Sequence, residues 1–253
     1  MSESNKQSIA RELKIFSDSI RKIILEMSLN AGSSSSHFGG ALSIADIVSV
    51  LFGYKIKIEK KTQNFEDRFI LSKGHACLAY YAALHKIDKI SVEEIKTFEK
   101  DNSDLAGHPV KNKKLGIDFS NGSLGMGLSI AIGIAISFKK RKKNNIVYVI
   151  LGDGECNEGS VWEAAMAASK FKLDNLVAII DNNKFQQTGS NKEIMDLENL
   201  ASKWTSFGWD ASKLDGHNIE NLMQYFDNLK TDTKPKVLIA KTIKGKGFSF
   251  SVE

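Results

Sequence analysis

Apolar positions recur along the chain with two different spacings, which predict helices interleaved with strands. Helical spacing predicts a first helix over residues 7–29 and a second over 43–51, expected to begin at Ser43 because Asp46 follows three positions later. Further helices are predicted within residues 73–87, 91–100, 121–141, 160–172 and 218–230. The segment 121–141 is apolar on nearly every side, so this helix is expected to be buried.

Uninterrupted β-branched runs predict the strands. NIVYVIL and NLVAIID have the composition of parallel strands that are covered on both faces. Shorter candidates are RFILS, WDASKLD and PKVLIAKT. Strands that alternate with helices predict an α/β fold, a doubly wound and mainly parallel sheet with helices on both faces, in a single domain over residues 1–253.

Composition excludes several classes of protein. Hydrophobic residues make up 42% of the 253, enough to build a sizeable core. The chain lacks an apolar run of membrane-spanning length, and its first residues are polar, so we expect a cytoplasmic protein with no membrane partner. Cys77 and Cys156 are expected to be reduced thiols. The basic run at residues 139–143 lacks aromatic neighbours, which favours a solvated helix end over a nucleic-acid partner.

The strand NIVYVIL runs into Gly152-Asp153-Gly154, an acid between two glycines. Ligands of open parallel sheets lie beyond the carboxyl ends of the strands, and glycines let the backbone pass close to a ligand. The helix that begins near Ser160 would direct its N-terminus toward the same crevice, which favours an anion. An acid beside an anion is explained if a cation such as Mg²⁺ lies between them.

The next buried strand offers a second oxygen ligand for this cation. Asn183 follows that strand and stands 30 residues after Asp153, a separation that fits two adjacent strand ends joined by a helix. A Gly-Asp-Gly turn alone is a weak signal. Combined with the Asn-Asn after the next strand, it matches the diphosphate–metal motif of thiamine-diphosphate enzymes.

Successive blocks of the chain resemble transketolase, in the order that this family has them. They are LSKGHACLAYYAAL, GHP, NGSLGMGLSIAIGIA, GDGECNEGSVWEAAMAASKFKLDNLVAIIDNNKFQQTG, GWDASKLDGHN and KVLIAKTIKGKG. The resemblance spans residues 9–247 and covers only the family's diphosphate-binding domain, because its pyrimidine and C-terminal domains have no counterpart. It implies the thiamine-diphosphate-binding fold, thiamine diphosphate with Mg²⁺ (or Ca²⁺) as cofactors, and transfer of a two-carbon ketol unit from a ketose phosphate to an aldose.

The same resemblance implies roles for individual residues. Asp153 and Asn183 match the side-chain ligands of the metal, and Phe185 matches a residue whose backbone carbonyl binds it. Contacts to the cofactor are implied for His75, Gly122, Ser123, Leu124, Asp153, Gly154, Glu155 and Asn183. Glu158 matches an acid that connects the two cofactor sites across a dimer, and it is grouped with the catalytic residues.

Three histidines are implied to be catalytic, namely His37, His75 and His108. The cofactor supplies the carbon nucleophile and the electron sink, while neutral imidazoles donate to a developing alkoxide or accept a hydroxyl proton near pH 7. A further histidine that the family has after its Lys-Gly-x-Gly segment is absent from this sequence. His85 is expected to be structural, and His217 to cap the following helix or shape a turn.

The family's cofactor lies between the diphosphate domain of one subunit and the pyrimidine domain of another. The resemblance therefore implies the N-terminal subunit of a split transketolase, whose partner is a separately encoded C-terminal subunit in a heterotetramer that acts on sugar phosphates. Two alternatives remain open at this stage. The chain could be the diphosphate-binding subunit of a 2-oxoacid dehydrogenase, or a non-catalytic scaffold subunit.

Overall fold

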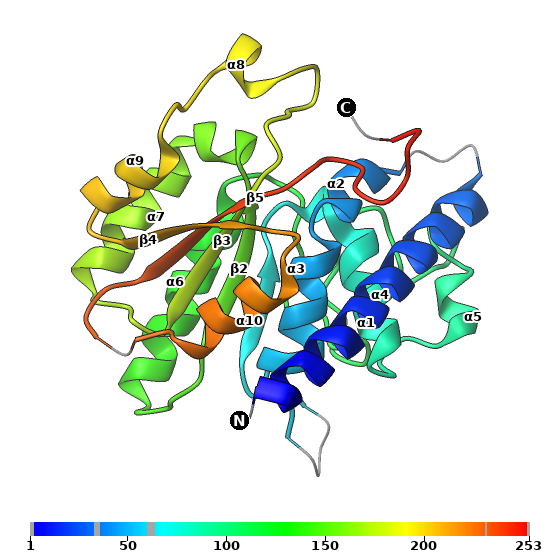
Figure 1. Cartoon of the computed structure of the whole chain (residues 1–253), viewed down its shortest axis with the longest axis horizontal. Coiled ribbons are helices and arrows are strands. Elements are labelled where there is room, and N and C mark those ends of the chain that lie inside the picture. Colours follow the sequence, from blue (N-terminus) through cyan, green and yellow to red (C-terminus); the bar gives the residue numbers. More distant parts are fainter. Residues whose placement is uncertain (1–2, 33–35, 60–63, 231, 252–253) are drawn as a thin grey trace.

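A five-stranded parallel sheet forms the centre of the computed structural model, which describes residues 3–32, 36–59, 64–230 and 232–251. Its strands lie in the order β1-β2-β3-β5-β4, and each neighbouring pair is parallel (Figure 1). The strands are β1 (Arg68–Leu71), β2 (Val147–Gly152), β3 (Leu176–Asn182), β4 (Asp210–Asp215) and β5 (Lys236–Lys241). The predicted doubly wound, parallel fold is confirmed.

Helices cover both faces of the sheet and bury two separate cores (Figure 1). On one face pack α1 (Glu3–Ala31), α3 (Ala45–Val50), α4 (Cys77–Lys86) and α10 (Ile219–Asp227). On the other pack α6 (Met126–Lys140), α7 (Gly159–Lys170) and α9 (Leu200–Ser206). Alternation along β2 supplies both cores, since Tyr148 and Ile150 face the first set of helices and Val149 faces the second. A strand with two apolar faces explains the uninterrupted apolar run in the sequence.

Short helical segments occupy several of the connections near the carboxyl ends of the strands. They are α2 (Phe38–Leu42), the π-helical turn η1 (Leu51–Lys55), the 3₁₀ turns η2 (Gly74–Ala76) and η3 (Gly154–Asn157), α5 (Val92–Ile95) and α8 (Asn191–Ile194). The predicted helix at 91–100 is therefore shorter than expected, although Ser91 and Glu94 do form a reciprocal capping box at its start.

The expected helix start at Ser43 is wrong. Helix α2 already begins at Phe38, and Ser43 lies in the turn that separates it from α3. The Ser43 hydroxyl donates to Asp181 Oδ2 at 2.6 Å, and Asp46 binds Ser17 and Arg21 of α1. Both side chains are therefore used in contacts between distant segments, which a local capping pattern cannot reveal.

The apolar helix predicted over 121–141 begins only at Met126 and is not buried on all sides. Gly125 adopts a left-handed conformation (φ 81°), which ends the preceding turn before the helix can start. Leu128 and Ala135 are fully buried against the sheet, whereas the Met126 side chain is 50% exposed. Part of this helix therefore presents an apolar surface that the described residues leave uncovered.

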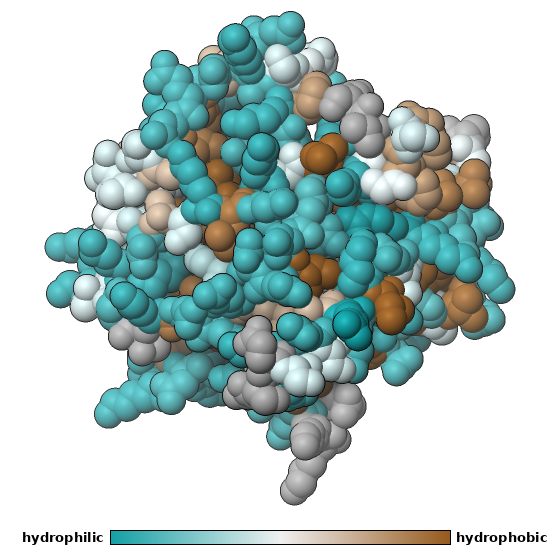
Figure 2. All heavy atoms as spheres, in the orientation of Figure 1, coloured by the Kyte–Doolittle hydropathy of each residue, from teal (hydrophilic) through white to brown (hydrophobic). Residues whose placement is uncertain are grey.

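The surface agrees with the expected absence of a membrane span in one respect. Within the described ranges, the structure contains no helix that combines the length and the apolar character needed to cross a bilayer. On the face shown in Figure 2, hydrophilic residues cover most of the surface and hydrophobic residues occur in separate small groups.

Gly127→Ala should destabilise the fold, because α6 passes very close to the end of β1 at this glycine. A Cβ at residue 127 would lie 2.7 Å from the Ser72 Cα, so the two backbones would have to separate. We expect the free energy of unfolding to fall by about 1–3 kcal/mol. At Gly133 of the same helix a Cβ would meet no atom within 4 Å, so Gly133→Ala should raise it by about 0.5–1 kcal/mol. Urea denaturation of both variants provides the measurement, and equal effects would contradict the close approach.

Candidate active site

The carboxyl ends of four neighbouring strands meet at one edge of the sheet and bring the predicted site residues together. Lys73 follows β1, Asp153 follows β2, Asn183 follows β3 and Thr242 follows β5. All four side chains are buried, with 8% exposure or less. Polar groups at this depth are tolerated only when they find partners, so their contacts indicate what the site is built to hold.

Asp153 is a buried carboxylate that has no cationic side chain as a partner among the described residues. Its Oδ1 accepts a hydrogen bond from the Gly154 N–H at 2.9 Å, and its Oδ2 accepts one from the Lys184 N–H at 2.7 Å. Burial, together with the nearby negative charge of Asp181, raises the pKa of Asp153 to about 6. A divalent cation would offset both effects, which suits the predicted role of Asp153 as a metal ligand.

The side chain of Asn183 is held in one orientation from both ends of its amide. Its Nδ2 donates to Asp181 Oδ2 at 2.9 Å, and its Oδ1 accepts from the Phe185 N–H at 3.0 Å. The bond from Lys184 to Asp153 joins this segment to the end of β2. The structure therefore brings Asp153, Asn183 and Phe185 together, as expected for shared ligands.

A search restricted to acidic, histidine and cysteine side chains would miss this site. The described residues contain no group of three such side chains that could hold a metal ion. Any ion at Asp153 would consequently need neutral oxygens as well, such as the Asn183 amide and a backbone carbonyl. Hard cations such as Mg²⁺ and Ca²⁺ accept those ligands readily.

A buried ion pair below Asn183 was not predicted from the sequence. Lys73 Nζ lies 2.5 Å from Asp181 Oδ2, and the two side chains are 1% and 0% exposed. Burial opposes the charge on Asp181, but Lys73 and hydrogen bonds, including one from Ser43, keep the pKa of this carboxyl below its usual value. Thr242 also donates to Asp181, so strands β1, β3 and β5 are joined at this carboxylate. The available signal was a charge at the end of an apolar strand.

The three predicted histidines lie together although they come from distant parts of the chain. The ring centroid of His37 is 5.6 Å from that of His75 and 6.4 Å from that of His108. Burial and the positive charge of Lys73 lower the pKa of His75 to about 3. Burial and the neighbouring His108 lower the pKa of His37. Both imidazoles are therefore neutral near pH 7, as acid–base work on hydroxyl groups requires.

The turn with Gly122, Ser123 and Leu124 borders this histidine group and is exposed. A Cβ at Gly122 would lie 3.8 Å from the His108 ring, so the turn and the histidine are neighbours. Glu155 lies below the turn and is buried. Its carboxylate accepts hydrogen bonds from the Gly125 N–H (2.8 Å), the Gly152 N–H (3.0 Å) and the Ser72 hydroxyl. Glu155 thus joins the turn to the end of β2.

Two further residues give the crevice the character of an anion site. The Lys244 ammonium lies 5.2 Å from the centre of the Phe185 ring, and its charge contributes to lowering the pKa of His37. The Gln186 Nε2 is buried without a hydrogen-bond partner among the described residues, and Gln186 packs against Gly154, where a Cβ would be 2.7 Å away. A lysine and an unused donor beside a buried acid fit a diphosphate with a divalent cation.

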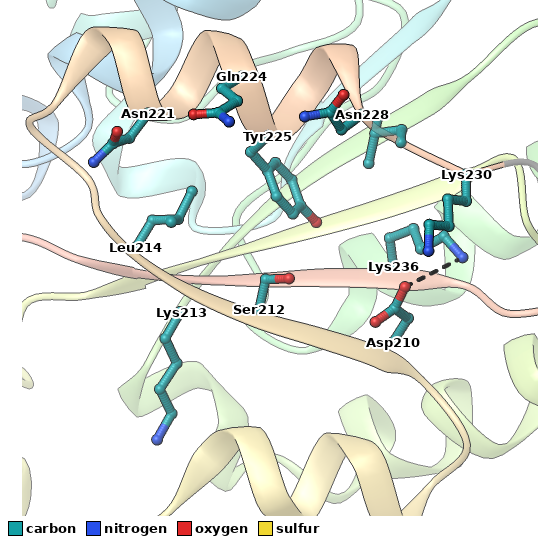
Figure 3. Close-up of a pocket in the computed structure, with 11 residues that line it drawn as sticks. Asp210, Ser212, Lys213, Leu214, Asn221, Gln224, Tyr225, Asn228, Lys230 and Lys236 are labelled. Carbon is teal, nitrogen blue, oxygen red and sulfur yellow. Dashed lines mark ion pairs between the residues drawn. The ribbon is translucent and has the colours of Figure 1, made fainter.

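A cavity of about 560 Å³ between β4 and α10 lies apart from these residues (Figure 3). Asp210, Ser212 and Tyr225 are among the side chains that line it, and the Asp210–Lys236 ion pair (3.5 Å) lies at one end. The cavity contains none of the predicted site residues. Its polar lining belongs to the edge of the sheet, so the candidate site is the crevice at the strand ends.

Comparison with known proteins supports the assignment of this crevice. Residues 14–251 match the family model described as transketolase, thiamine diphosphate binding domain. One of the two subunits of the apulose-4-phosphate transketolase of Phocaeicola vulgatus is 39% identical over 241 residues, which are 94% of this chain and 85% of that protein. The 6-deoxy-6-sulfo-D-fructose transketolase subunit SqwG of a Clostridium species is 40% identical over 235 residues, covering 92% and 85%.

Solved structures give the same result. The transketolase of Campylobacter jejuni superposes with a TM-score of 0.86 at 31% identity, and the match covers 94% of this chain but 38% of that one. The chain thus corresponds to one part of the longer enzyme and to most of the length of the relatives that are named as subunits. It belongs to the transketolase family of transferases, as a counterpart of the subunits that carry the thiamine-diphosphate-binding domain.

Proposed function

We propose that this chain is the cofactor-binding subunit of a two-subunit transketolase, which transfers a two-carbon ketol unit from an anionic ketose to an aldose. The observation that carries the proposal is the meeting of Asp153, the Asn183–Phe185 segment and three histidines at adjacent strand ends. When bound, thiamine diphosphate supplies the carbon nucleophile and the electron sink of the reaction.

The protein's part is to hold the cofactor and to exclude water from it. Asp153, Asn183 and the Phe185 carbonyl would bind Mg²⁺ or Ca²⁺, and Lys244 would face the diphosphate at the same place. Gly154 already donates its N–H to Asp153, so it lies at the metal loop where a diphosphate would approach. The exposed turn Gly122–Leu124 would lie along the cofactor, and Glu155 fixes that turn from below.

The histidines act on the hydroxyl and carbonyl groups of the sugar. Because burial keeps His75 neutral, its ring can donate one hydrogen bond and accept another without a change in charge. His37 and His108 are exposed at the mouth of the crevice and are suited to contact the donor sugar. Two relatives are named for a sugar phosphate and a sulfonated sugar, which supports a ketose with a terminal anion as the substrate class.

A separately encoded C-terminal subunit is the proposed partner, in a cytoplasmic heterotetramer. Leu124, Met126 and Met166 are 37%, 50% and 53% exposed and lie on the turn before α6, on α6 and on α7. Exposed apolar side chains of this size next to a crevice favour an interaction surface. Glu158 is exposed just before α7, where it would face that partner. The buried free thiols of Cys77 and Cys156 suit a reducing compartment.

The decisive experiment combines this chain with its candidate C-terminal partner and supplies thiamine diphosphate and Mg²⁺. We expect ketol transfer from a ketose phosphate to an aldose only when both chains are present, with no turnover of 2-oxoacids. Ketol transfer by this chain alone would contradict the two-subunit assignment. Calorimetry that detects no thiamine diphosphate binding, even with the partner, would favour a scaffold subunit and overturn the proposal.

A further inference from the structure

A buried charged cluster away from the crevice joins the N-terminal helix to the loop after β4. Asp46 of α3 receives Arg21 of α1 (Nη2–Oδ2, 2.5 Å) and the Nδ1 of His217 (2.8 Å from Oδ2). The three side chains are between 3% and 11% exposed. Burial opposes the charge on Asp46, but hydrogen bonds from His217 and Arg21 hold its pKa well below the usual value. We name Arg21, Asp46 and His217 the clamp cluster.

His217 does not cap the following helix, which corrects one of the two structural roles expected for it. Asn218 is the N-cap of α10, and its side chain accepts from the Asn221 N–H at 2.9 Å. The His217 ring instead lies between Asp46 and the C-terminal segment. The Ile243 N–H donates to its Nε2 at 2.9 Å, so Nε2 must carry a lone pair and Nδ1 the proton that is donated to Asp46.

The clamp cluster holds the C-terminal segment at two points. His217 accepts from Ile243, and the Arg21 Nε donates to the Lys246 carbonyl at 3.1 Å. Gly247 makes this approach possible, because it has a φ of 112° and a Cβ there would be 2.8 Å from the Arg21 Cδ. Two side chains thus fix the residues on either side of Lys244 and Gly245.

The fixed segment runs past α2 and reaches the crevice (Figure 1). The Gly245 N–H donates to the Gly39 carbonyl at 3.0 Å, two residues after His37. This contact leaves Lys244 beside His37 and over the Phe185 ring. The position of the Lys244 ammonium therefore depends on contacts that lie on the far side of the segment.

We propose that the clamp cluster positions Lys244 in the cofactor crevice, so that Arg21, Asp46 and His217 control anion binding without touching the anion. Clamping of segment 243–247 stands on the contacts alone. The identity of the anion as thiamine diphosphate rests on the proposed function. Arg21, Asp46 and His217 are accordingly positioning residues.

Two substitutions at His217 separate the two halves of its role. His217→Gln keeps an acceptor near the Nε2 position for the Ile243 N–H, whereas His217→Asn keeps a donor near Nδ1 for Asp46 and removes the acceptor. In hydrogen–deuterium exchange on the full chain, His217→Asn should raise exchange of the 243–248 amides about tenfold or more, the loss expected for one buried hydrogen bond. His217→Gln should exchange like the wild type in this segment.

Thiamine diphosphate affinity in the presence of Mg²⁺ and the C-terminal partner then tests the position of Lys244. His217→Asn should weaken binding about tenfold, close to the effect of Lys244→Met, and the double variant should be little weaker than either alone. His217→Gln should retain affinity even though loss of the Asp46 contact lowers its melting temperature. A purely structural role predicts the reverse, with affinity following thermal stability.

Each outcome decides a separate part of the proposal. Unchanged exchange in His217→Asn would overturn the clamp. Faster exchange with unchanged affinity, or additive losses in the double variant with Lys244→Met, would overturn the positioning of Lys244. A wild-type complex that binds no thiamine diphosphate would overturn the proposed function instead, and the exchange comparison would still decide whether the clamp holds the segment.

Discussion

Asp153→Asn should abolish metal-dependent cofactor binding and, at the same time, stabilise the cofactor-free chain. The carboxylate is buried beside Asp181, so its charge is unfavourable until a divalent cation offsets it. Asparagine retains the shape but not the charge. We expect thiamine diphosphate affinity in Mg²⁺ to fall about 100-fold or more, since loss of even a supporting contact costs 10–100-fold at metal sites.

The stabilisation should depend on pH in a defined direction. The pKa of Asp153 is raised from 3.8 to about 6 in the folded chain, so its contribution to stability is present below pH 3.8 and is lost as pH rises through 6. Without metal, Asp153→Asn should therefore exceed the wild type by roughly 2–3 kcal/mol above pH 6 and by little near pH 4.

Thermal unfolding between pH 4 and 8, with and without Mg²⁺ and thiamine diphosphate, measures both effects. Asp104→Asn replaces an exposed carboxylate and serves as the matched control, with no expected change in either quantity. Wild-type affinity in Asp153→Asn would remove Asp153 from the metal site. A stability difference that is independent of pH would contradict the buried, cation-dependent carboxylate.

Lys73→Met should be the most destabilising single substitution in the crevice. It leaves the fully buried Asp181 carboxylate without its cation, and breaking a buried pair from one side costs about 3–5 kcal/mol. Lys55→Met is the matched control, because the Lys55–Asp227 pair is partly exposed and should contribute about 1 kcal/mol or less.

Addition of Asp181→Asn to Lys73→Met should recover part of the lost stability, because no unpaired charge then remains buried. Cofactor affinity should not recover to the same extent, since Asp181 also orients the Asn183 amide. Urea denaturation and calorimetry measure the two quantities on the same four proteins. Equal costs for Lys73→Met and Lys55→Met would show that burial does not strengthen the pair.

The parts of the site that the sequence predicts are those encoded by the ends of single strands. Asp153 and Asn183 follow apolar runs, and strand ends in a parallel sheet converge, so both could be placed in one crevice before the structure was known. The Lys73–Asp181 pair joins residues 108 positions apart. It depends on which strands are neighbours, which local patterns do not specify. Ser43 was misinterpreted for the same reason, since its partner is a distant carboxylate.

The extent of burial was also beyond the sequence. An apolar pattern on every side of residues 126–140 indicates that the helix must be covered, but it does not say whether the same chain or another protein covers it. The exposed Met126 and the open space at Gly133 show that the described residues cover only part of it. The prediction of full burial failed on this point, and the failure identifies the surface proposed for the partner.

The strand order has a consequence for how the chain is made. Strand β4 pairs only with β5, which follows it in the sequence and inserts between β3 and β4. During synthesis the open edge of β3 therefore waits through the whole of β4 and α10, exposed to incorrect pairing with other chains. Thr242 and Lys244 arrive directly after β5, so anion capture in the crevice becomes possible only once this insertion is complete. Cofactor supplied during translation would then reward correctly assembled chains and leave misassembled ones to degradation.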